Sequence, residues 1–316
     1  MKVSVCITVF NEEANIRKLL ESLLEQSKKP DEIFIVDGGS RDRTVQIIKH
    51  YQKKDKRIKL IVEKGSCAHG RNVSIELAKN KIVAITDAGC IAKKDWLEKI
   101  TYGFKHRRVK LIAGFYDMTH KNNLQKVINV YHGVPPKRFD PLTFIPSARS
   151  VAFRKSLWQD VGGFSEKLQK AGEDTLFFYE CVKRGVKILR VKEARVVWFE
   201  SATLSFKDSI MKFYQYALGD AQTKIWWHPS KRMASHNIKI SMIFARYIVA
   251  LALIILSFKY NHLFGILGIF VVLYLIWPIY KWFDVIKDWK SRILLPFVQI
   301  VVDICVMLGF IVGHFK

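Results

Sequence analysis

Two carboxylate sites in separate parts of the chain carry residue types that could act together on one substrate. Glu173 and Asp174 begin a stretch with helical spacing, and Asp87 follows a run of apolar residues. A carboxylate such as Asp174 can take a proton from an attacking hydroxyl group, and Asp87 could hold a divalent cation or a ribose beside a diphosphate. Together the two sites form a constellation suited to moving a sugar from a nucleotide. Taken alone, Glu173 and Asp174 could also simply begin a helix, where acidic residues favour the positive end of the dipole.

The elements that would position these carboxylates alternate between strand and helix. Apolar runs of strand length occupy residues 3–9, 32–36, 58–62 and 81–86. Helical patterns lie between them, at residues 16–24, 44–51 and 72–78. This alternation predicts an α/β fold, with a mainly parallel, Rossmann-like sheet covered by helices on both faces.

Three polar loops directly follow predicted strands, at residues 10–12, 37–40 and 87–89. Ligands of such sheets bind at the carboxyl ends of the strands. Any one of these loops could be an ordinary turn or helix cap. Three acidic loops at the same edge of one sheet favour a ligand site.

The alternation ends after about residue 115. Beyond it lies an irregular segment marked by prolines at 135, 136 and 141. We then expect a helix at 173–184 and two short strands near 187–191 and 195–199. Residues 207–227 have an amphipathic helical pattern with a cluster of aromatic residues. We interpret them as an interfacial helix that couples the preceding domain to a bilayer, although a buried domain helix is nearly as well supported.

Three hydrophobic segments close the chain, near residues 240–258, 263–280 and 293–314. Each approaches the ~20 residues that are needed to cross a bilayer, so residues 239–316 are predicted to form a membrane domain with three transmembrane helices. Basic residues in the loop 281–292 place that loop and the N-terminal domain in the cytosol, with the C-terminus on the far side. We expect Arg246 to snorkel towards the cytosolic end and Asp303, in mid-span, to pair within the helix bundle.

The basic composition and the cysteines limit the other possibilities. The formal net charge is +24, and attraction to anionic lipid headgroups or a set of solvated lysine-rich helix faces explains it equally well. Nucleic acid is a weaker explanation because no nucleic-acid-binding module accompanies the scattered basic residues. The five cysteines are widely spaced, which favours a reducing compartment over a zinc site or a disulfide framework. The apolar run at residues 3–9 is too short for a secretory signal and fits a buried strand.

Short motifs in a characteristic order extend this interpretation. They are Val3–Glu13, Asp37–Thr44, Gly70-Arg71-Asn72, Thr86–Gly89, Pro146-Ser147, Val151–Arg154, Val161–Phe164, Gly172-Glu173-Asp174 and Tyr216–Asp220. Together they resemble a family 2 glycosyltransferase of the GT-A fold over residues 1–228. The resemblance implies a nucleotide-sugar-binding half at 1–115 and an acceptor half at 116–228.

The resemblance also implies which residues bind the nucleotide sugar. Four residues would line the nucleoside pocket: Thr8, Phe10, Asn11 and Glu12. Asp37 would contact the base and Arg71 would help to hold the nucleotide. Asp87 would reach the ribose or a divalent cation, Mg²⁺ or Mn²⁺, that bridges the diphosphate. Gly89 lies in the same binding loop, at the place of the second carboxylate of the family's Asp-x-Asp motif.

The acceptor half would carry the catalytic groups. Asp174 would be the general base that deprotonates the acceptor hydroxyl, which gives direct displacement with inversion, and Glu173 would orient that site. In the closing element, Gln215 and Leu218 stand where relatives commonly carry arginines. This departure changes how the diphosphate or an anionic acceptor would be held.

The leading hypothesis is a membrane-anchored, inverting glycosyltransferase at the cytosolic face of the cell membrane. It would transfer a sugar from a nucleotide-sugar donor to a lipid-linked or polysaccharide acceptor, because a lipid carrier partitions into the bilayer beside such a domain. One alternative is a non-catalytic nucleotide-sugar-binding subunit of a membrane glycan-assembly complex. Another is a synthase whose spans conduct the polymer, for which three short segments are too few unless the chain oligomerises.

Overall fold

The computed structural model describes residues 1–315 except 169, 200–203 and 228–234. The chain divides into two compact units. The sheet unit holds the described residues of Met1–Thr119 and Phe139–Ser201. The helical unit holds those of His120–Arg138, Ala202–His228 and Met233–Lys316. Residues 120–138 and 204–227, which the sequence assigns to the acceptor half, therefore pack with the C-terminal helices.

Eight strands form one mixed sheet in the order β3-β2-β1-β4-β7-β6-β8-β5. Their bounds are β1 Val3–Val9, β2 Glu32–Asp37, β3 Ile58–Val62, β4 Ile82–Ile85, β5 Cys90–Ala92, β6 Leu111–Met118, β7 Val151–Arg154 and β8 Ile188–Trp198. The first four strands are parallel, β7 is antiparallel to both of its neighbours, and β5 is antiparallel to β8. The predicted α/β fold with a mainly parallel N-terminal sheet is confirmed.

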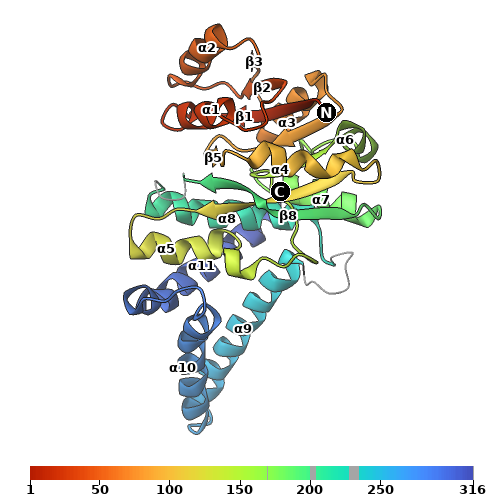
Figure 1. The fold of residues 1–316 in the computed structure, drawn as a ribbon. Coiled ribbons are helices and arrows are strands. Elements are labelled where there is room, and N and C mark those ends of the chain that lie inside the picture. Colours follow the sequence, from red (N-terminus) through yellow and green to blue (C-terminus); the bar gives the residue numbers. More distant parts are fainter. Residues whose placement is uncertain (169, 200–203, 228–234, 316) are drawn as a thin grey trace. The chain divides into compact units, whose positions relative to one another are not determined.

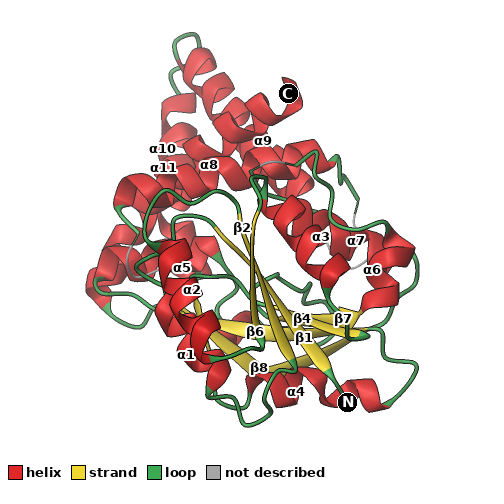
Figure 2. Cartoon of the chain, turned by 90° about the horizontal axis from the view of Figure 1, so that it is seen from above, coloured by secondary structure: helices red, strands yellow, loops and turns green. Residues whose placement is uncertain are grey.

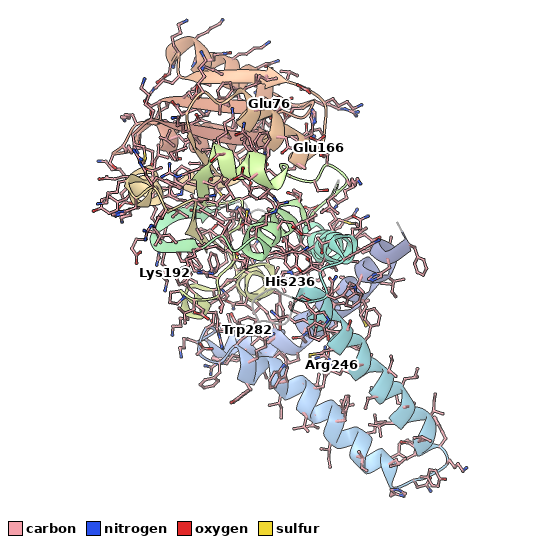
Figure 3. All side chains as sticks on the ribbon, turned by 90° about the vertical axis from the view of Figure 1, so that its right-hand side faces the viewer. Glu76, Glu166, Lys192, His236, Arg246 and Trp282 are labelled. Atoms are coloured by element: carbon pink, nitrogen blue, oxygen red, sulfur yellow. The ribbon has the colours of Figure 1, made fainter. Side chains whose placement is uncertain are left out.

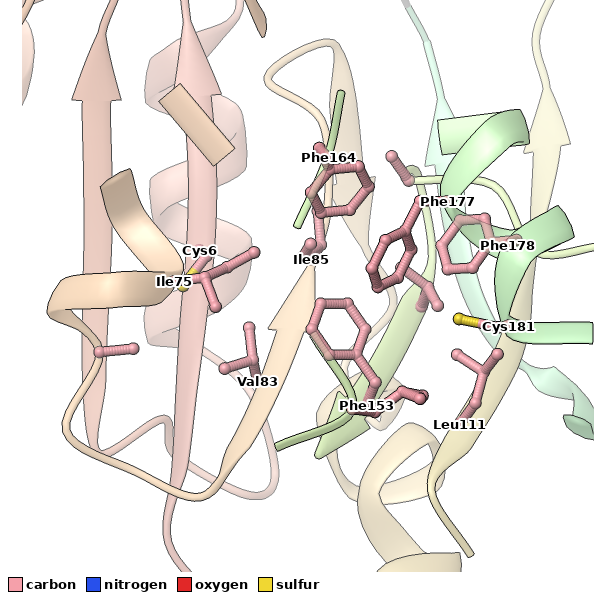
Figure 4. Packing of buried hydrophobic residues seen from close by; sticks show 14 of the residues in the cluster. Cys6, Ile75, Val83, Ile85, Leu111, Phe153, Phe164, Phe177, Phe178 and Cys181 are labelled. Atoms are coloured by element: carbon pink, nitrogen blue, oxygen red, sulfur yellow. The ribbon is translucent and has the colours of Figure 1, made fainter. Parts of the chain in front are cut away.

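Helices cover both faces of the sheet (Figure 2). The helices of the sheet unit are α1 Ile16–Leu24, α2 Thr44–Lys54, α3 Cys67–Leu77, α4 Trp96–Tyr102, α6 Lys155–Val161 and α7 Glu173–Lys183, with a 3-10 turn at Gly103–Lys105. Apolar residues of α3, α6 and α7 pack on one face in a common core (Figure 4), which includes Ile75, Leu157, Phe177 and Phe178. Burial of each such side chain contributes roughly 1.5–3 kcal/mol. This core fixes α3 and α7, the two helices that carry predicted site residues.

The sequence places a strand break near residues 192–194, but the structure has one continuous strand, β8. The polar residues Lys192 and Glu193 interrupt the apolar pattern without ending the strand. A register shift lies opposite them, between Ala113 and Phe115 of β6. A Cβ at Gly114 would lie 2.4 Å from the carbonyl oxygen of Ala194, so the bulge depends on glycine at that position.

The helical unit consists of α5 Asn123–His132, α8 Phe206–Thr223, α9 His236–Ser257, α10 Leu263–Lys281 and α11 Trp289–Phe315, with a 3-10 turn at Pro136–Arg138. The last three helices are each long and apolar enough to cross a membrane. They overlap the three predicted hydrophobic segments. The amphipathic segment predicted at 207–227 is α8, and its apolar face is buried within this unit, with Phe213 packed in a core that α5 and α11 share.

A buried polar cluster joins the three C-terminal helices. Asp303 of α11 is fully buried and accepts hydrogen bonds from Gln299 (2.6 Å), Tyr274 (2.8 Å) and Tyr247 (3.3 Å). Arg246 of α9 forms an ion pair with the same carboxylate (its position is labelled in Figure 3). The expectation that Asp303 pairs within the bundle is met, and Arg246 is one of its partners.

Candidate active site

Arg71 joins two carboxylates that the sequence places far apart. Its Nη2 donates to Oδ1 of Asp87 at 3.1 Å, and its Nη1 donates to Oε1 of Glu173. Asp87 follows β4, Glu173 is the first residue of α7, and Arg71 is in α3. Arg71 and Glu173 are buried, whereas a third of the Asp87 side chain is exposed. Burial raises the pKa of Glu173, and the Arg71 cation opposes that rise.

Asp174 follows Glu173 at the start of α7 and is held by backbone groups. Its Oδ1 accepts from the N–H of Thr175 at 2.7 Å, and its Oδ2 accepts from the N–H of Ala148 at 3.2 Å. The second bond ties the carboxylate to the segment that leads into β7. Asp174 also interacts electrostatically with Arg71. The two acidic residues of this helix start therefore have different partners: Glu173 neutralises the buried arginine, and Asp174 has no cationic hydrogen-bond partner in the described part of the chain.

Asp37 ends β2 and organises the loop that follows it. Its Oδ1 accepts from the N–H groups of Gly39 at 3.0 Å and Ser40 at 2.8 Å. The side chain is fully buried, and Oδ2 makes no hydrogen bond with any described residue. A buried carboxylate oxygen without a donor needs a partner. A ligand N–H group in the loop would provide one.

Helix α3 packs closely on β1. This contact brings Thr8, at the predicted nucleoside pocket, next to the helix that carries Arg71. A Cβ at Gly70 would lie 2.7 Å from Cγ2 of Thr8, so glycine is required there for the approach. One turn earlier, Sγ of Cys67 lies 3.2 Å from Oγ1 of Thr8. Thr8 therefore lies against the turn of α3 that carries Arg71.

The loop after β1 is held by the loop after β2. Asn11 has a positive φ of 53°, donates its N–H to Oγ of Ser40 at 2.8 Å, and accepts from the N–H of Arg41 at 2.9 Å. Glu12 donates its N–H to Oγ1 of Thr44 at 2.7 Å, and the ring of Phe10 is largely exposed. The polar groups of Asn11 that were predicted to line a nucleoside pocket thus also close this pair of loops. Gly89 is buried in the turn between β4 and β5.

The structure adds residues that the sequence analysis did not single out. Asn72 uses its whole side-chain amide: it accepts from the N–H of Phe164 and from the Trp158 indole, and it donates to the Phe164 carbonyl and to Glu166. Its place beside Arg71 in the Gly70-Arg71-Asn72 motif was the available signal. Arg149 stacks over Trp198 with its guanidinium carbon 4.0 Å from the ring centroid. No sequence pattern indicates that contact, because it joins distant segments.

His69 joins α3 to two loops through carboxylates on both sides of its ring. Nε2 lies 2.7 Å from Glu63 and Nδ1 lies 3.0 Å from Glu166. The bond to Glu63, followed by the bond to Glu166, raises the pKa of His69. Because the folded pKa is raised, the protonated ring adds stability that is fully present below its ordinary pKa of about 6.5 and is lost as the pH rises through the folded value.

We expect His69→Gln to lower the free energy of unfolding more at about pH 6 than at about pH 9. The difference between the two pH values should be no more than about 1 kcal/mol, because the partners are half-exposed. Denaturant unfolding in detergent at the two pH values measures the difference. Glu63→Gln should remove part of the same pH dependence. An equal loss at both pH values would show that the ring acts only by packing.

The family model for glycosyl transferase family 2 matches residues 4–161, half of the chain. The protein belongs to glycosyl transferase family 2. Among curated relatives, this family 2 chain is 30% identical to glycosyltransferase AglE of Haloferax volcanii over 187 residues, which cover 54% of this chain and 58% of the relative. It is 32% identical to an uncharacterised glycosyltransferase of Haemophilus influenzae over 185 residues, which cover 57% of this chain and 72% of the relative. The match to AglE thus spans less than two thirds of that relative's length.

Solved structures show the same fold as this family 2 chain. The mannosyltransferase PcManGT from Pyrobaculum calidifontis, in complex with GDP-Man and Mn²⁺, has a TM-score of 0.67 and 17% identity, covering 98% of this chain and 87% of that one. S. aureus TarS in complex with UDP has a TM-score of 0.51 and 19% identity, covering 77% of this chain and 78% of that one. The GT-A-like fold predicted from the motifs is confirmed.

Proposed function

We propose that this family 2 protein is a membrane-anchored, inverting glycosyltransferase that uses a nucleoside diphosphate sugar. Its acceptor would be a hydroxyl group of a lipid-linked or polysaccharide glycan at the cytosolic face of the membrane. The observation that carries this proposal is the Asp87–Arg71–Glu173 bridge with Asp174 directly beside it. The bridge joins the loop after β4, which would hold the diphosphate, to helix α7, which would present Asp174 as the general base.

Because Arg71 neutralises Glu173, the adjacent acids Glu173 and Asp174 have different roles. Glu173 is buried and committed to the guanidinium, so its role is to position α7 and Arg71. Asp174 has only backbone N–H donors as hydrogen-bond partners among the described residues, and these orient the carboxylate. A carboxylate in that state can accept the proton of an acceptor hydroxyl as that oxygen attacks the anomeric carbon.

The nucleoside would lie across the ends of β1 and β2. Oδ2 of Asp37 makes no hydrogen bond within the described part of the chain, and it offers an acceptor for an N–H group of a nucleobase. The other predicted pocket residues lie in or beside the loop after β1: Thr8, Phe10, Asn11 and Glu12. The structures of the two neighbours contain GDP-Man and UDP, which supports a nucleoside diphosphate donor here.

The residues around Asp87 fit a divalent cation with few protein ligands. Asp87 gives Oδ1 to Arg71, and a third of its side chain is exposed. The described residues contain no group of three or more acidic, histidine or cysteine ligands. Mg²⁺ is commonly held by one or two carboxylates together with substrate phosphates. The neighbour with GDP-Man contains Mn²⁺. When bound, such a cation would offset the charge that develops on the leaving diphosphate.

A screen of nucleotide sugars tests this function. We expect the purified protein to hydrolyse one donor slowly in the presence of Mn²⁺ or Mg²⁺, and we expect Asp87→Asn to lower that rate by about 10²-fold. Asp95→Asn, a surface carboxylate paired with Lys99, is the matched control and should hydrolyse normally. Donor binding without turnover under any metal condition, with or without glycan acceptors, would instead support a non-catalytic binding subunit.

A further inference from the structure

Helix α11 has two different faces along its whole length. One face is buried and includes polar and small residues among apolar ones: Ser291, Gln299, Asp303, Gly309 and Gly313. The opposite face is apolar and exposed, and its side chains recur at helical spacing: Ile293, Phe297, Ile304, Leu308, Ile311 and Phe315. We call the second set the α11 apolar stripe.

The buried face of α11 packs along α8 and also meets the α9–α10 hairpin at Asp303. A Cβ at Gly309 would lie 2.2 Å from the carbonyl oxygen of Tyr214, and one at Gly313 would lie 2.5 Å from that of Leu218. At the other end of the contact, the ring of Phe206 stacks on Phe297. The two helices therefore run side by side in the same direction from the start of α8 to its last turns.

The charges of α8 make a transmembrane path for α11 costly. Helix α8 carries Lys207, Asp208, Lys212 and Asp220, and α11 is 27 residues long, about 40 Å. If α11 crossed the ~30 Å hydrocarbon core, the companion α8 would enter it too. Each charge at the centre of a bilayer costs at least about 2.5 kcal/mol.

Helices α9 and α10 form a hairpin that α11 meets near its base. The contacts that join α11 to the hairpin involve Phe244 and Arg246 of α9 and Tyr274 of α10. Towards the tip, the hairpin exposes large apolar residues on both helices, among them Ile254, Ile255, Ile269 and Val272. In Figure 1 the hairpin extends away from α8 and α11.

The residues around the hairpin base are those of a membrane–water interface. Trp226 and Trp227 follow α8, Trp289 begins α11, and all three are exposed. Four basic residues lie near Trp289 in the sequence: Lys281, Lys287, Lys290 and Arg292. Aromatic and basic side chains gather at the headgroup level of bilayers. This level also suits Asp303, because a carboxylate there no longer lies at mid-membrane.

We propose that α11 lies in the plane of the membrane surface, with its apolar stripe in the lipid, and that only the α9–α10 hairpin crosses the bilayer. The partner of the stripe is the acyl–headgroup boundary of a lipid bilayer. In this arrangement the C-terminus is on the same side of the membrane as the N-terminus. Three crossings, as hydropathy alone predicts, put it on the opposite side.

Protease protection in sealed vesicles distinguishes the two arrangements. Epitope tags would be placed in the full-length protein at the N-terminus, at the C-terminus and in the hairpin turn between Tyr260 and Asn261. We expect the two terminal tags to have the same accessibility to the protease. The hairpin tag should be protected where the terminal tags are digested, and digested where they are protected. A C-terminal tag that shares the accessibility of the hairpin tag would overturn the proposal.

Spin labels measure the depth of the stripe directly. Single cysteines at Phe297, Ile304 and Ile311, with Cys67 and Cys305 replaced by alanine, should report the same depth from oxygen and nickel-chelate accessibility. A crossing helix would separate the outer two labels by about 21 Å in depth. Labels at Val249 and Leu256 of α9, about 10 Å apart along the helix, provide the control for a crossing element. Stripe labels shielded from both reagents would show a protein partner in place of lipid and would also refute the proposal.

Discussion

Asp174→Asn is expected to reduce the rate of sugar transfer by about 10²–10⁴-fold while donor affinity stays unchanged. The amide has nearly the same shape as the carboxylate but cannot accept the proton of the acceptor hydroxyl. It also places an NH₂ group against one of the two backbone N–H donors, Thr175 or Ala148. Losing that bond should cost about 1 kcal/mol of stability, too little to unfold the protein. Steady-state transfer and titration of the donor measure the two effects separately.

The matched control for Asp174→Asn is Glu180→Gln on the same helix. Glu180 is partly exposed and pairs with Lys183 at 3.7 Å, so its neutralisation should leave transfer and donor affinity unchanged. Transfer by the Asp174→Asn variant at the wild-type rate would refute the assignment of the base. Loss of donor affinity in that variant would instead place Asp174 in the donor pocket.

Arg71→Met is expected to lower the free energy of unfolding by about 3–5 kcal/mol and to abolish donor binding. The substitution leaves the buried Glu173 carboxylate without its cation, and breaking a buried pair on one side has a penalty of this size. It also releases Asp87, whose orientation Arg71 sets through the 3.1 Å bond. Denaturant unfolding in detergent and donor titration give the two quantities.

Two further variants separate the electrostatic effect from a loss of packing. Arg71→Met combined with Glu173→Gln removes both charges, so it should recover most of the stability but none of the donor binding. Arg57→Met breaks the pair with Asp55, whose side chains are 30% and 22% exposed, and should cost no more than about 1 kcal/mol. If Arg71→Met were as mild as Arg57→Met, the bridge would not hold the site together.

Much of the fold could be predicted from local patterns. Apolar runs of strand length gave β1 to β4, and the 3.6-residue period gave α1, α7 and α8 to within a few residues. The start of α3 was predicted five residues late, because Cys67, Ala68 and Gly70 carry little periodic signal even though Ser66 caps the helix by accepting from the N–H of His69. Strand β8 was divided in two because a bulge and a break look alike in sequence.

The sequence by itself determined which residue types are available: the acids at 87, 173 and 174, the Gly70-Arg71-Asn72 motif, and three apolar segments of membrane length. Only the tertiary structure decided that Arg71 joins Asp87 to Glu173 and that Asn72 secures the Phe164 loop. It also decided that Arg246 pairs with Asp303 and that α8 covers one face of α11. The physical reason is that hydropathy and periodicity record which face of an element avoids water. Whether lipid, another helix or a buried ion pair covers that face depends on segments far away in the chain.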